Sequence, residues 1–301
     1  MGETTGIQWT GSTWTPIRAR HRVTGKVGWH CTKPSAGCKF CYSESLNKRL
    51  GTGEGYTPNA PVDVFLDEKM LRAPLRWRAP RKIFVCSMTD LFGEFVTDTM
   101  IDRVFAVMAA SPQHTYQVLT KRAERMRTYL CNHEVGARWA FSGDRKPLVC
   151  AGTAVEWTRH GLPNVWIGCS VENQQMADNR IPVLLNTPAA VRFLSVEPLL
   201  APMNVAFSQT STWSAASDYR INGRRVDWII VGGESGAGAR RCDLEWIGFI
   251  VDQCKAAKVA CFVKQLGKNA YAMDKRWPIT DSKGGNIDDF PDDLKIRQYP
   301  A

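Results

Sequence analysis

Short apolar runs recur along the chain, and each of them ends in a small group of polar residues. The runs are rich in Val, Ile, Leu and Phe and are continuous rather than alternating, which is typical of strands covered on both faces in a parallel sheet. The pattern predicts strands within residues 82–90, 115–122, 164–173, 191–199, 226–235 and 259–267.

Helical periodicity fills several of the intervals between these runs. Residues 97–111 place apolar side chains at helical spacing, with a capping residue at Thr97 or the position after it. Residues 243–259 carry a second apolar stripe, and residues 173–188 carry a weaker one in which Pro182 predicts a break. Strands that alternate with helices indicate an α/β protein with a parallel sheet, either open or closed into a barrel.

Two segments fit this rhythm poorly. Residues 131–163 and 207–225 are rich in Arg, Asn, Ser and Gly and look like loop insertions. Such segments either shape a substrate site or are solvated excursions of the chain. We therefore expect one domain over residues 1–301 that carries these two insertions.

A charged or amide side chain follows every one of the apolar runs. In a parallel sheet the carboxyl ends of the strands share one edge, which is where barrels and open sheets bind their ligands. The pattern favours a functional site at that edge, although chains also turn polar simply where strands reach the surface. The residues concerned are Asp90, Lys121 with Arg122, Glu172 with Asn173, Glu197, Glu234, and Lys264 with Gln265.

The stretch VGGESGAGAR (231–240) is rich in glycine but is neither a Walker A loop nor the GxGxxG dinucleotide fingerprint. Gly232 and Gly233 either let the backbone approach a ligand closely or belong to a plain tight turn.

The stretch CTKPSAGCKFCY (31–42) arranges Cys31, Cys38 and Cys41 as C-x6-C-x2-C. In a reducing compartment, clustered cysteines bind metal more often than they form disulfides. A zinc site would need a fourth ligand, for which His30 is available, but no second CxxC pair exists in the chain. A 4Fe–4S cluster normally takes four thiolates, so three would leave one iron open to S-adenosylmethionine. On spacing alone, a cluster, a zinc ion and no metal all remain open.

The balance of charge favours a polyanionic partner. The net charge is +10 and the isoelectric point is about 9.2, and nucleic acid is the commonest partner of such proteins. The basic segment RAPLRWRAPRK (72–82) is a candidate for contacts with a nucleic-acid backbone or is a solvated run of charge. Trp9, Trp14 and Trp77 are expected to pack in the core.

The first residues, MGETTGIQWT, lack the basic and apolar regions of a signal peptide and do not match a myristoylation site. No apolar stretch approaches the roughly 20 residues that cross a bilayer. We expect a cytoplasmic location and no contact with a membrane.

Several blocks together resemble one family. The chain is similar to a phage and prophage family with a three-cysteine motif and no known function, which is regarded as radical SAM-like and is distantly similar to spore photoproduct lyase. The C-x6-C-x2-C spacing is that family's own form, whereas the segment before Cys31, residues 17–30, is longer than is usual there. The similar blocks are residues 6–16, 31–42, 87–94, 105–126, 167–174, 189–200 and 227–240.

This resemblance implies a partial (β/α) barrel of the radical SAM type, with Cys31, Cys38 and Cys41 as the ligands of a 4Fe–4S cluster and S-adenosylmethionine as a second cofactor. Tyr42 would lie beside the adenine. The remaining candidates for contacts with the cofactor are Ser87, Thr89 and Asp90 near the methionine amino group, Ser170, Glu172 and Asn173 near the ribose, and Gly232 and Gly233. Glu197, Glu234 and Lys264 would face cofactor or substrate and are the candidate catalytic residues.

The resemblance also implies a substrate. Phages use radical enzymes to hypermodify DNA, so we expect a radical rearrangement or modification of a nucleobase, for instance in a decorated thymidine, by an isomerase, a lyase or a base-modifying enzyme. An external electron donor of the flavodoxin or ferredoxin type would reduce the cluster. The alternatives are a radical SAM enzyme that acts on a peptide or small metabolite, and a non-enzymatic zinc module that binds nucleic acid.

Overall fold

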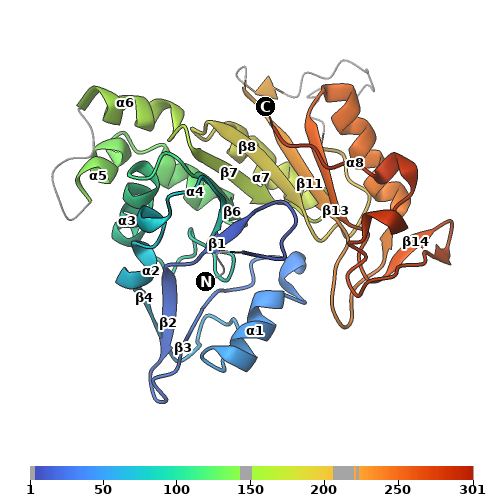
Figure 1. The fold of residues 1–301 in the computed structure, drawn as a ribbon, viewed down its shortest axis with the longest axis horizontal. Helices are drawn as coiled ribbons and strands as arrows, with labels where there is room; N and C mark the ends of the chain where they lie inside the picture. The colour runs from blue at the N-terminus through green and yellow to red at the C-terminus, as the bar shows by residue number, and fades with distance from the viewer. Residues whose placement is uncertain (1–3, 143–150, 206–219, 222–223, 301) are drawn as a thin grey trace. The chain divides into compact units, whose positions relative to one another are not determined.

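The computed structural model of the protein describes residues 4–142, 151–205, 220–221 and 224–300. The chain is a mixed α/β protein (Figure 1). Its strands are β1 (Ser12–Trp14), β2 (Ile17–His21), β3 (Val27–Gly28), β4 (Val62–Leu66), β5 (Lys82–Val85), β6 (Thr115–Thr120), β7 (Val165–Ser170), β8 (Val191–Val196), β9 (Arg220–Ile221), β10 (Arg224–Arg225), β11 (Trp228–Gly232), β12 (Cys242–Asp243), β13 (Ala260–Gln265), β14 (Ala270–Ala272) and β15 (Lys275–Arg276). Its α-helices are α1 (Tyr42–Leu50), α2 (Glu68–Leu71), α3 (Asp98–Ala109), α4 (Ala123–Leu130), α5 (Val135–Phe141), α6 (Ala151–His160), α7 (Gln174–Leu185) and α8 (Leu244–Ala257).

All six predicted strands are present, as β5, β6, β7, β8, β11 and β13. Five of these strands end before their polar residues, which lie in the segments that leave the sheet, whereas Lys264 and Gln265 are the last two residues of β13. The sequence analysis missed β1, which has only three residues and is held by parallel pairing of Ser12 with Ile83 and of Trp14 with Val85. The expectation of an α/β protein with parallel strands is confirmed.

The main strands follow the order β1-β5-β6-β7-β8-β11-β13. By their contacts the residues divide into two compact units, and the division falls within β7. Unit 1 consists of Met1–Ser35, Cys41–Ile167 and Thr187–Ala190, and unit 2 consists of Ala36–Phe40, Gly168–Asn186 and Val191–Ala301. Each unit is described by itself.

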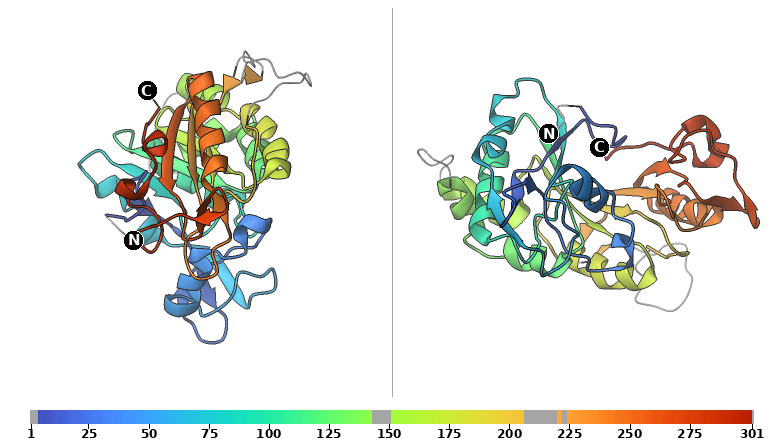
Figure 2. Two further views of the ribbon diagram at one scale, coloured as in Figure 1. Left: turned by 90° about the vertical axis from the view of Figure 1, so that its right-hand side faces the viewer. Right: turned by 90° about the horizontal axis from the view of Figure 1, so that it is seen from below.

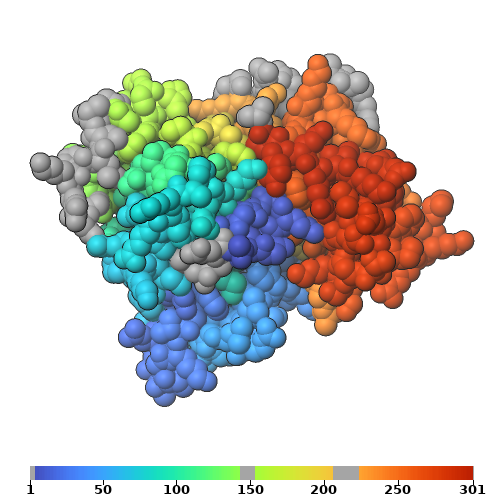
Figure 3. Space-filling model, in the orientation of Figure 1, coloured from blue at the N-terminus to red at the C-terminus, as the bar shows by residue number. Residues whose placement is uncertain are grey.

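Unit 1 contains the parallel strands β1, β5 and β6 and a second, antiparallel sheet in the order β3-β2-β4. The hairpin of β2 and β3 reaches the surface of the unit (Figure 3). The core includes Trp14, Tyr116 and Phe105, and the ring of Phe105 stacks on Trp139 of α5 at 4.6 Å. Trp9, Trp14 and Trp77 are all buried, as predicted.

The segment 131–163 is helical in much of its described part. It contains α5 and α6, which pack on each other, and α5 also packs on α3. Buried Asp102 of α3 ties that helix to α4 and α5, because it accepts bonds from Tyr129 of α4 at 2.6 Å and from the Arg138 guanidinium of α5 at 3.0 Å. Residues 143–150 lie outside the described part of the chain.

Unit 2 contains the parallel strands β8, β11 and β13, with α8 packed against β11 and β13 (Figures 1 and 2). The helix expected over 173–188 is α7, but Pro182 lies inside it rather than at a break. The prediction of a break was wrong because buried Ile181 and Leu184, on either side of the proline, anchor the helix to the core. Of the predicted insertion at 207–225, only the short antiparallel pair of β9 and β10 falls among the described residues.

Among the described residues, no helix is both long and apolar enough to cross a membrane.

Candidate functional site

The cysteines of the three-cysteine loop, residues 31–42, differ in environment from those of the core. All nine cysteines within the described residues are outside disulfides. Cys31, Cys38 and Cys41 are partly exposed, whereas Cys86 and Cys169 are buried in apolar runs, as the sequence predicts. The loop therefore presents thiol groups at the surface, while the core cysteines act as small hydrophobic residues.

The first arm of the loop is fixed by the ends of β5 and β6 in unit 1. The Thr89 hydroxyl donates to the carbonyl of His30, and the Arg122 guanidinium donates to both the hydroxyl and the carbonyl of Thr32. The same guanidinium forms an ion pair of 3.0 Å with Asp90, and both side chains are buried. Two neighbouring strand ends thus hold the residues on either side of Cys31.

Asp90 has no acceptor capacity left for a ligand. One of its carboxylate oxygens accepts from the Phe92 amide at 3.0 Å and the Thr120 hydroxyl at 2.7 Å. The other accepts from the Lys121 amide at 3.1 Å and from Arg122 at 3.0 Å. A carboxylate offers about four lone-pair sites, so this side chain is saturated by protein donors. We therefore place Asp90 among the positioning residues rather than among the contacts to a cofactor.

The last arm of the loop reaches the same turn after β5. The hydroxyl of Tyr42 donates to the carbonyl of Ser87 at 2.6 Å, and that of Tyr56 donates to the carbonyl of Met88 at 2.8 Å. The structure thus brings Tyr42 and Ser87 together, and their contacts with a cofactor stay a prediction. The Tyr42 ring remains half exposed and leaves a face for stacking.

Two of the cysteines of the loop, Cys31 and Cys41, lie near the hydroxyl of Tyr56. Burial raises the pKa of Tyr56, and the nearby thiols of Cys41 and Cys31 raise it further. An ion pair of 2.6 Å between Lys33 and Glu44 joins the two arms that carry these cysteines. Within unit 1, the first and third cysteines are therefore held in one neighbourhood.

The middle of the loop, residues 36–40, belongs to unit 2 and is held there. The amide of Gly37 donates to Glu172 at 3.0 Å, and the Arg240 guanidinium donates to the carbonyl of Ala36 at 2.9 Å. Glu172 is fully buried and its second oxygen pairs with Arg180 at 3.1 Å. One carboxylate oxygen of Glu172 therefore binds the loop and the other binds Arg180, so Glu172 positions the backbone beside Cys38.

Glu234 supports the same contact from the end of β11. It accepts from the Arg240 side chain at 2.6 and 2.8 Å and from its amide at 3.0 Å. The Arg240 guanidinium also lies over the ring of Phe40, 5.4 Å from its centroid. Glu234 is thus occupied in orienting Arg240 and is not a free catalytic carboxylate.

Ser170 and Asn173, predicted to lie near a ribose, have structural partners. Ser170 is buried and its carbonyl accepts from Arg180 at 2.8 Å. The side-chain oxygen of Asn173 caps α7 by accepting from the Met176 amide at 3.0 Å. The capping bond accounts for Asn173 without a ligand, whereas the bond at Ser170 is made by the backbone carbonyl and leaves the role of its hydroxyl a prediction.

The pair Glu197 and Lys264 is different. The two charged groups lie 2.9 Å apart at the ends of β8 and β13, and 12% and 24% of their side-chain surfaces are exposed. The same Glu197 oxygen is buried without a hydrogen bond of good geometry, and its other oxygen has only a long contact of 3.4 Å from Ser195. This pair has no described contact with the three-cysteine loop.

Gly232 and Gly233 lie close to the backbone of residues at and after the end of β13. A Cβ atom on Gly232 would lie 2.8 Å from the carbonyl of Gln265, and one on Gly233 would lie 2.3 Å from that of Leu266. The space that these glycines leave is filled by the backbone at the end of β13. At these two positions the close approach is therefore made by the protein backbone, and a contact of the glycines with a cofactor stays a prediction.

The basic segment 72–82 leads into the amino end of β5, whereas the candidate site lies at the carboxyl ends of the strands. Lys82 begins β5 and is paired with Thr115, the first residue of β6. The turn that holds the three-cysteine loop lies at the opposite, carboxyl ends of these strands. The segment is exposed at Arg76 and Arg78, but it is not a neighbour of Cys31.

The side chain of His30 does not present itself as a zinc ligand. Its ring packs edge-on against Phe95 at 4.7 Å and lies 6.4 Å from Tyr56. Burial and the charge of Arg122 lower the pKa of His30. Within the part of the chain that the structure describes, no three His, Cys, Asp or Glu side chains are gathered as a metal site.

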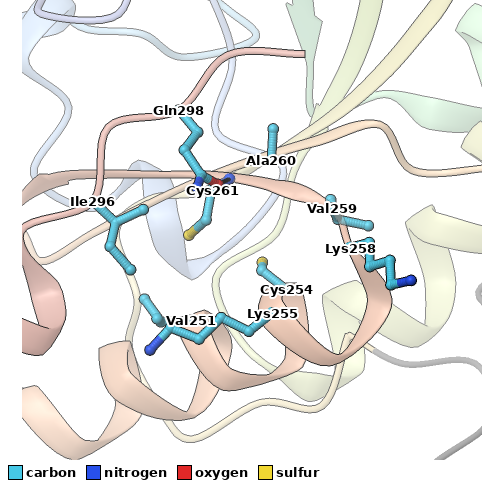
Figure 4. A pocket seen from close by; sticks show the side chains of 9 residues that line it. All are labelled: Val251, Cys254, Lys255, Lys258, Val259, Ala260, Cys261, Ile296 and Gln298. Carbon is cyan, nitrogen blue, oxygen red and sulfur yellow. Dashed lines mark hydrogen bonds between the residues drawn. The ribbon is translucent and has the colours of Figure 1, made fainter. Parts of the chain in front are cut away.

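A cavity of about 360 Å³ occurs elsewhere in unit 2, between the end of α8, the start of β13 and residues 296–298 (Figure 4). The thiol groups of Cys254 and Cys261 point toward each other beside it, and the interaction with Cys261 together with burial raises the pKa of Cys254. Because the cavity lies at the amino end of β13, it is separate from the strand-end residues.

Sequence reasoning overlooked Arg180 and Arg240, which hold the carboxylates at the ends of β7 and β11. Arg240 is the last residue of the glycine-rich stretch 231–240, so an arginine at the end of that stretch was the available signal. Arg180 carried no signal, because a basic residue within a helix is ordinary.

A family model described as a protein of unknown function (DUF5131) matches residues 4–291. No curated protein and no solved structure matches the chain.

Proposed function

The chain belongs to the DUF5131 family, whose function is unknown, and on this premise we propose that it is a radical S-adenosylmethionine enzyme that modifies or rearranges a nucleobase. The observation that carries the proposal is the way in which the three-cysteine loop is held. Its backbone is bound on both sides of Cys31 by Thr89 and Arg122, and beside Cys38 by Glu172 and Arg240.

This arrangement suits a cluster with an open iron. The bonds that anchor the loop go to backbone groups and to the Thr32 hydroxyl rather than to sulfur. The thiols have only weak partners of their own: that of Cys31 donates to the Thr32 carbonyl at 3.4 Å, and that of Cys41 lies 3.1 Å from the Ser43 hydroxyl. Binding of a metal would replace these contacts.

The three thiols of the loop are all outside disulfides and partly exposed. A closed zinc site would need a fourth ligand, and the ring of the nearest candidate, His30, is buried and packs edge-on against Phe95. In donor type and number, Cys31, Cys38 and Cys41 fit a 4Fe–4S cluster that keeps one position for S-adenosylmethionine.

The bound cofactors would supply an electron and a 5′-deoxyadenosyl radical, which abstracts hydrogen from an unactivated carbon. The protein residues then have separate tasks. Thr89 and Arg122 fix the loop at Cys31, and the saturated carboxylate of Asp90 keeps Arg122 in place. Tyr42 offers an exposed aromatic face directly after Cys41, suited to stacking on the adenine.

The residues that face the substrate would be Glu197 and Lys264. They are the charged pair at the strand ends that is partly exposed and is not used to hold the loop. Lys264 Nζ lies 2.9 Å from a Glu197 oxygen, so the pair can pass a proton to or from a bound group or bind a polar edge of a base. A nucleobase substrate also agrees with the net charge of +10.

The test starts with protein purified and reconstituted without oxygen. We expect about four iron and four sulfide per chain, and formation of 5′-deoxyadenosine from S-adenosylmethionine when dithionite is added. Single Cys31→Ala, Cys38→Ala and Cys41→Ala variants should each lose this activity. Cys131→Ala is the matched control, because Cys131 is exposed and lies outside the loop.

Stoichiometric zinc without iron in the anaerobic protein would contradict the proposal and favour a zinc module. Retention of S-adenosylmethionine cleavage by one of the three loop variants would remove that cysteine from the ligand set. Cleavage that is stimulated by a peptide and not by any nucleotide or DNA would retain the radical chemistry and overturn the substrate.

A further inference from the structure

The segment that leads into the three-cysteine loop is strongly basic. Residues 17–30 contain four arginine or lysine residues and no aspartate or glutamate. They form the hairpin of β2 and β3, which pairs with β4 on its other side. We call the exposed side of this three-stranded sheet the hairpin face.

The alternation of β2 determines which residues the hairpin face carries. Ile17 and Ala19 are buried, so Arg18 and Arg20 point to the opposite side. Phe65 of β4 lies directly across from Arg18 in the register of the sheet. Basic and aromatic residues therefore share this face.

The arginines and aromatic rings of the hairpin face are in direct contact. The guanidinium of Arg18 lies over the ring of Trp29 at 4.7 Å, and that of Arg20 lies over the ring of Phe65 at 5.3 Å. Trp29 and Phe65 are only partly buried. Each pair presents a flat group together with a positive charge.

The positive charge of the face is only partly neutralised. Arg22 pairs with Asp63 at 2.8 Å, but both side chains are largely exposed. Asp63 lies directly across from Arg20 in the register of the sheet, but within the described residues neither Arg20 nor Lys26 forms an ion pair.

The hairpin is fixed next to the three-cysteine loop. The Trp29 amide donates to the Asn47 side chain at 2.9 Å, and Gly28 packs so closely on Asn47 that a Cβ atom would lie 2.4 Å from its oxygen. The next residue, His30, is held by Thr89 at the end of β5. The hairpin face thus belongs to the carboxyl-end side of unit 1, unlike the basic segment 72–82.

We propose that the hairpin face binds a single-stranded stretch of nucleic acid, and this deepens the proposed function by naming where its substrate strand lies. Arginine and lysine neutralise phosphates, and aromatic rings stack on unpaired bases of any sequence. A protein or lipid partner is less suited to a face in which rings alternate with guanidinium groups. An unpaired strand also offers a base that is already out of a duplex.

The experiment measures binding of a fluorescein-labelled 20-nucleotide single-stranded DNA to the apo protein by fluorescence anisotropy. The double variant Arg20→Glu/Lys26→Glu should weaken binding by about tenfold or more and lower the slope of log K against log salt by about 2. The matched control is Arg76→Glu/Arg78→Glu, which makes the same change in net charge within 72–82. It should bind within about twofold of the wild type.

Equal losses in the two double variants would overturn the proposal, because only net charge would then matter. Tighter binding of the corresponding duplex would also overturn it and would favour a duplex-binding face. The variant Arg20→Gln/Lys26→Gln and circular dichroism of all variants guard against misfolding. The DNA-binding assay uses protein without cofactor, so its result does not depend on the radical chemistry. Cleavage of S-adenosylmethionine is measured separately and does not depend on DNA binding.

Discussion

The strand ends beside Cys31 in unit 1 and the ends of β8 and β13 in unit 2 use their charged residues differently. In unit 1, Asp90 has four protein donors and Arg122 binds two carboxylates and the loop. In unit 2, Glu197 and Lys264 have each other and one long contact from Ser195.

The difference shows how positioning groups can be told from groups available for chemistry. A side chain whose donors or acceptors are all satisfied by protein cannot bind a ligand without losing an existing bond. Burial and charge alone do not separate the two cases, since Asp90 and Glu197 both end strands and are both mostly hidden. The number of satisfied lone pairs does separate them.

The largest effect is expected from Arg122→Met. It would leave the Asp90 carboxylate buried without its cation and would release the loop at Thr32, so the free energy of unfolding should fall by about 3–5 kcal/mol. Urea unfolding measures the loss. Arg127→Met is the control, because its ion pair with Glu124 is exposed and should cost less than about 1 kcal/mol. Similar losses in both variants would show that the Asp90 pair is no more than a surface contact.

The second test separates the two regions by function. Glu197→Gln should retain iron and uncoupled cleavage of S-adenosylmethionine within about twofold, but it should lose about 100-fold in product formed from the nucleic-acid substrate. Glu234→Gln should instead lower iron retention, because Glu234 orients Arg240 on the loop. Iron analysis and product formation are measured on both variants. Loss of iron in Glu197→Gln would place this residue with the positioning groups.

A pair of glycine variants asks whether the end of β11 is filled by protein or open to a ligand. Gly233→Ala should destabilise the fold by about 1–3 kcal/mol, because the new Cβ atom would meet the carbonyl of Leu266. Gly248→Ala, in α8 where no atom lies within 4 Å, should stabilise by about 0.5–1 kcal/mol. Thermal unfolding compares the two. If Gly233→Ala leaves the stability unchanged but weakens binding of S-adenosylmethionine, then Gly233 contacts the cofactor.

The smallest effect concerns the Lys33–Glu44 pair across the loop. Burial alone would raise the pKa of Glu44, but its bonds to Lys33 and the Tyr56 amide and the nearby lysine charges outweigh this and lower the pKa below 4.5. The stabilisation is thus fully present above pH 4.5 and is lost as the pH falls through the lowered value.

Glu44→Gln should therefore lose about 0.5–1 kcal/mol at pH 7 and should be less sensitive to acid than the wild type. Unfolding in urea at pH 7 and pH 3.5 provides the measurement. Glu124→Gln, in an exposed pair, should follow the wild type at both pH values. A wild type and a Glu44→Gln variant with equal acid sensitivity would show that the pair does not hold the loop.

Much of the fold followed from local pattern. The continuous apolar runs predicted six strands, and Thr97 was correctly expected as a cap of α3, where it accepts from the Met100 amide. The strand β1 escaped notice because three residues carry no periodic signal. The break predicted at Pro182 is absent because the burial of α7 outweighs the loss of one backbone hydrogen bond.

The candidate site was predictable in its residue types but not in their roles. The spacing of Cys31, Cys38 and Cys41 identified the loop, and polar strand ends identified the edge of the sheet. Which carboxylate is saturated could not be read from the sequence, since the donors to Asp90 and Glu172 come from residues far along the chain or from helix interiors. The basic segment 72–82 was chosen on composition, which does not reveal at which end of a strand a charge lies.

By itself, the sequence determined the α/β class, the three-thiol loop and the excess of positive charge, because these depend on local periodicity, short spacing and composition. Only the tertiary structure decided that Arg122, Arg180 and Arg240 occupy three of the strand-end carboxylates and that Glu197 and Lys264 are left to each other. The physical reason is that hydrogen bonds and ion pairs are satisfied in space, by whichever donors folding brings within about 3 Å.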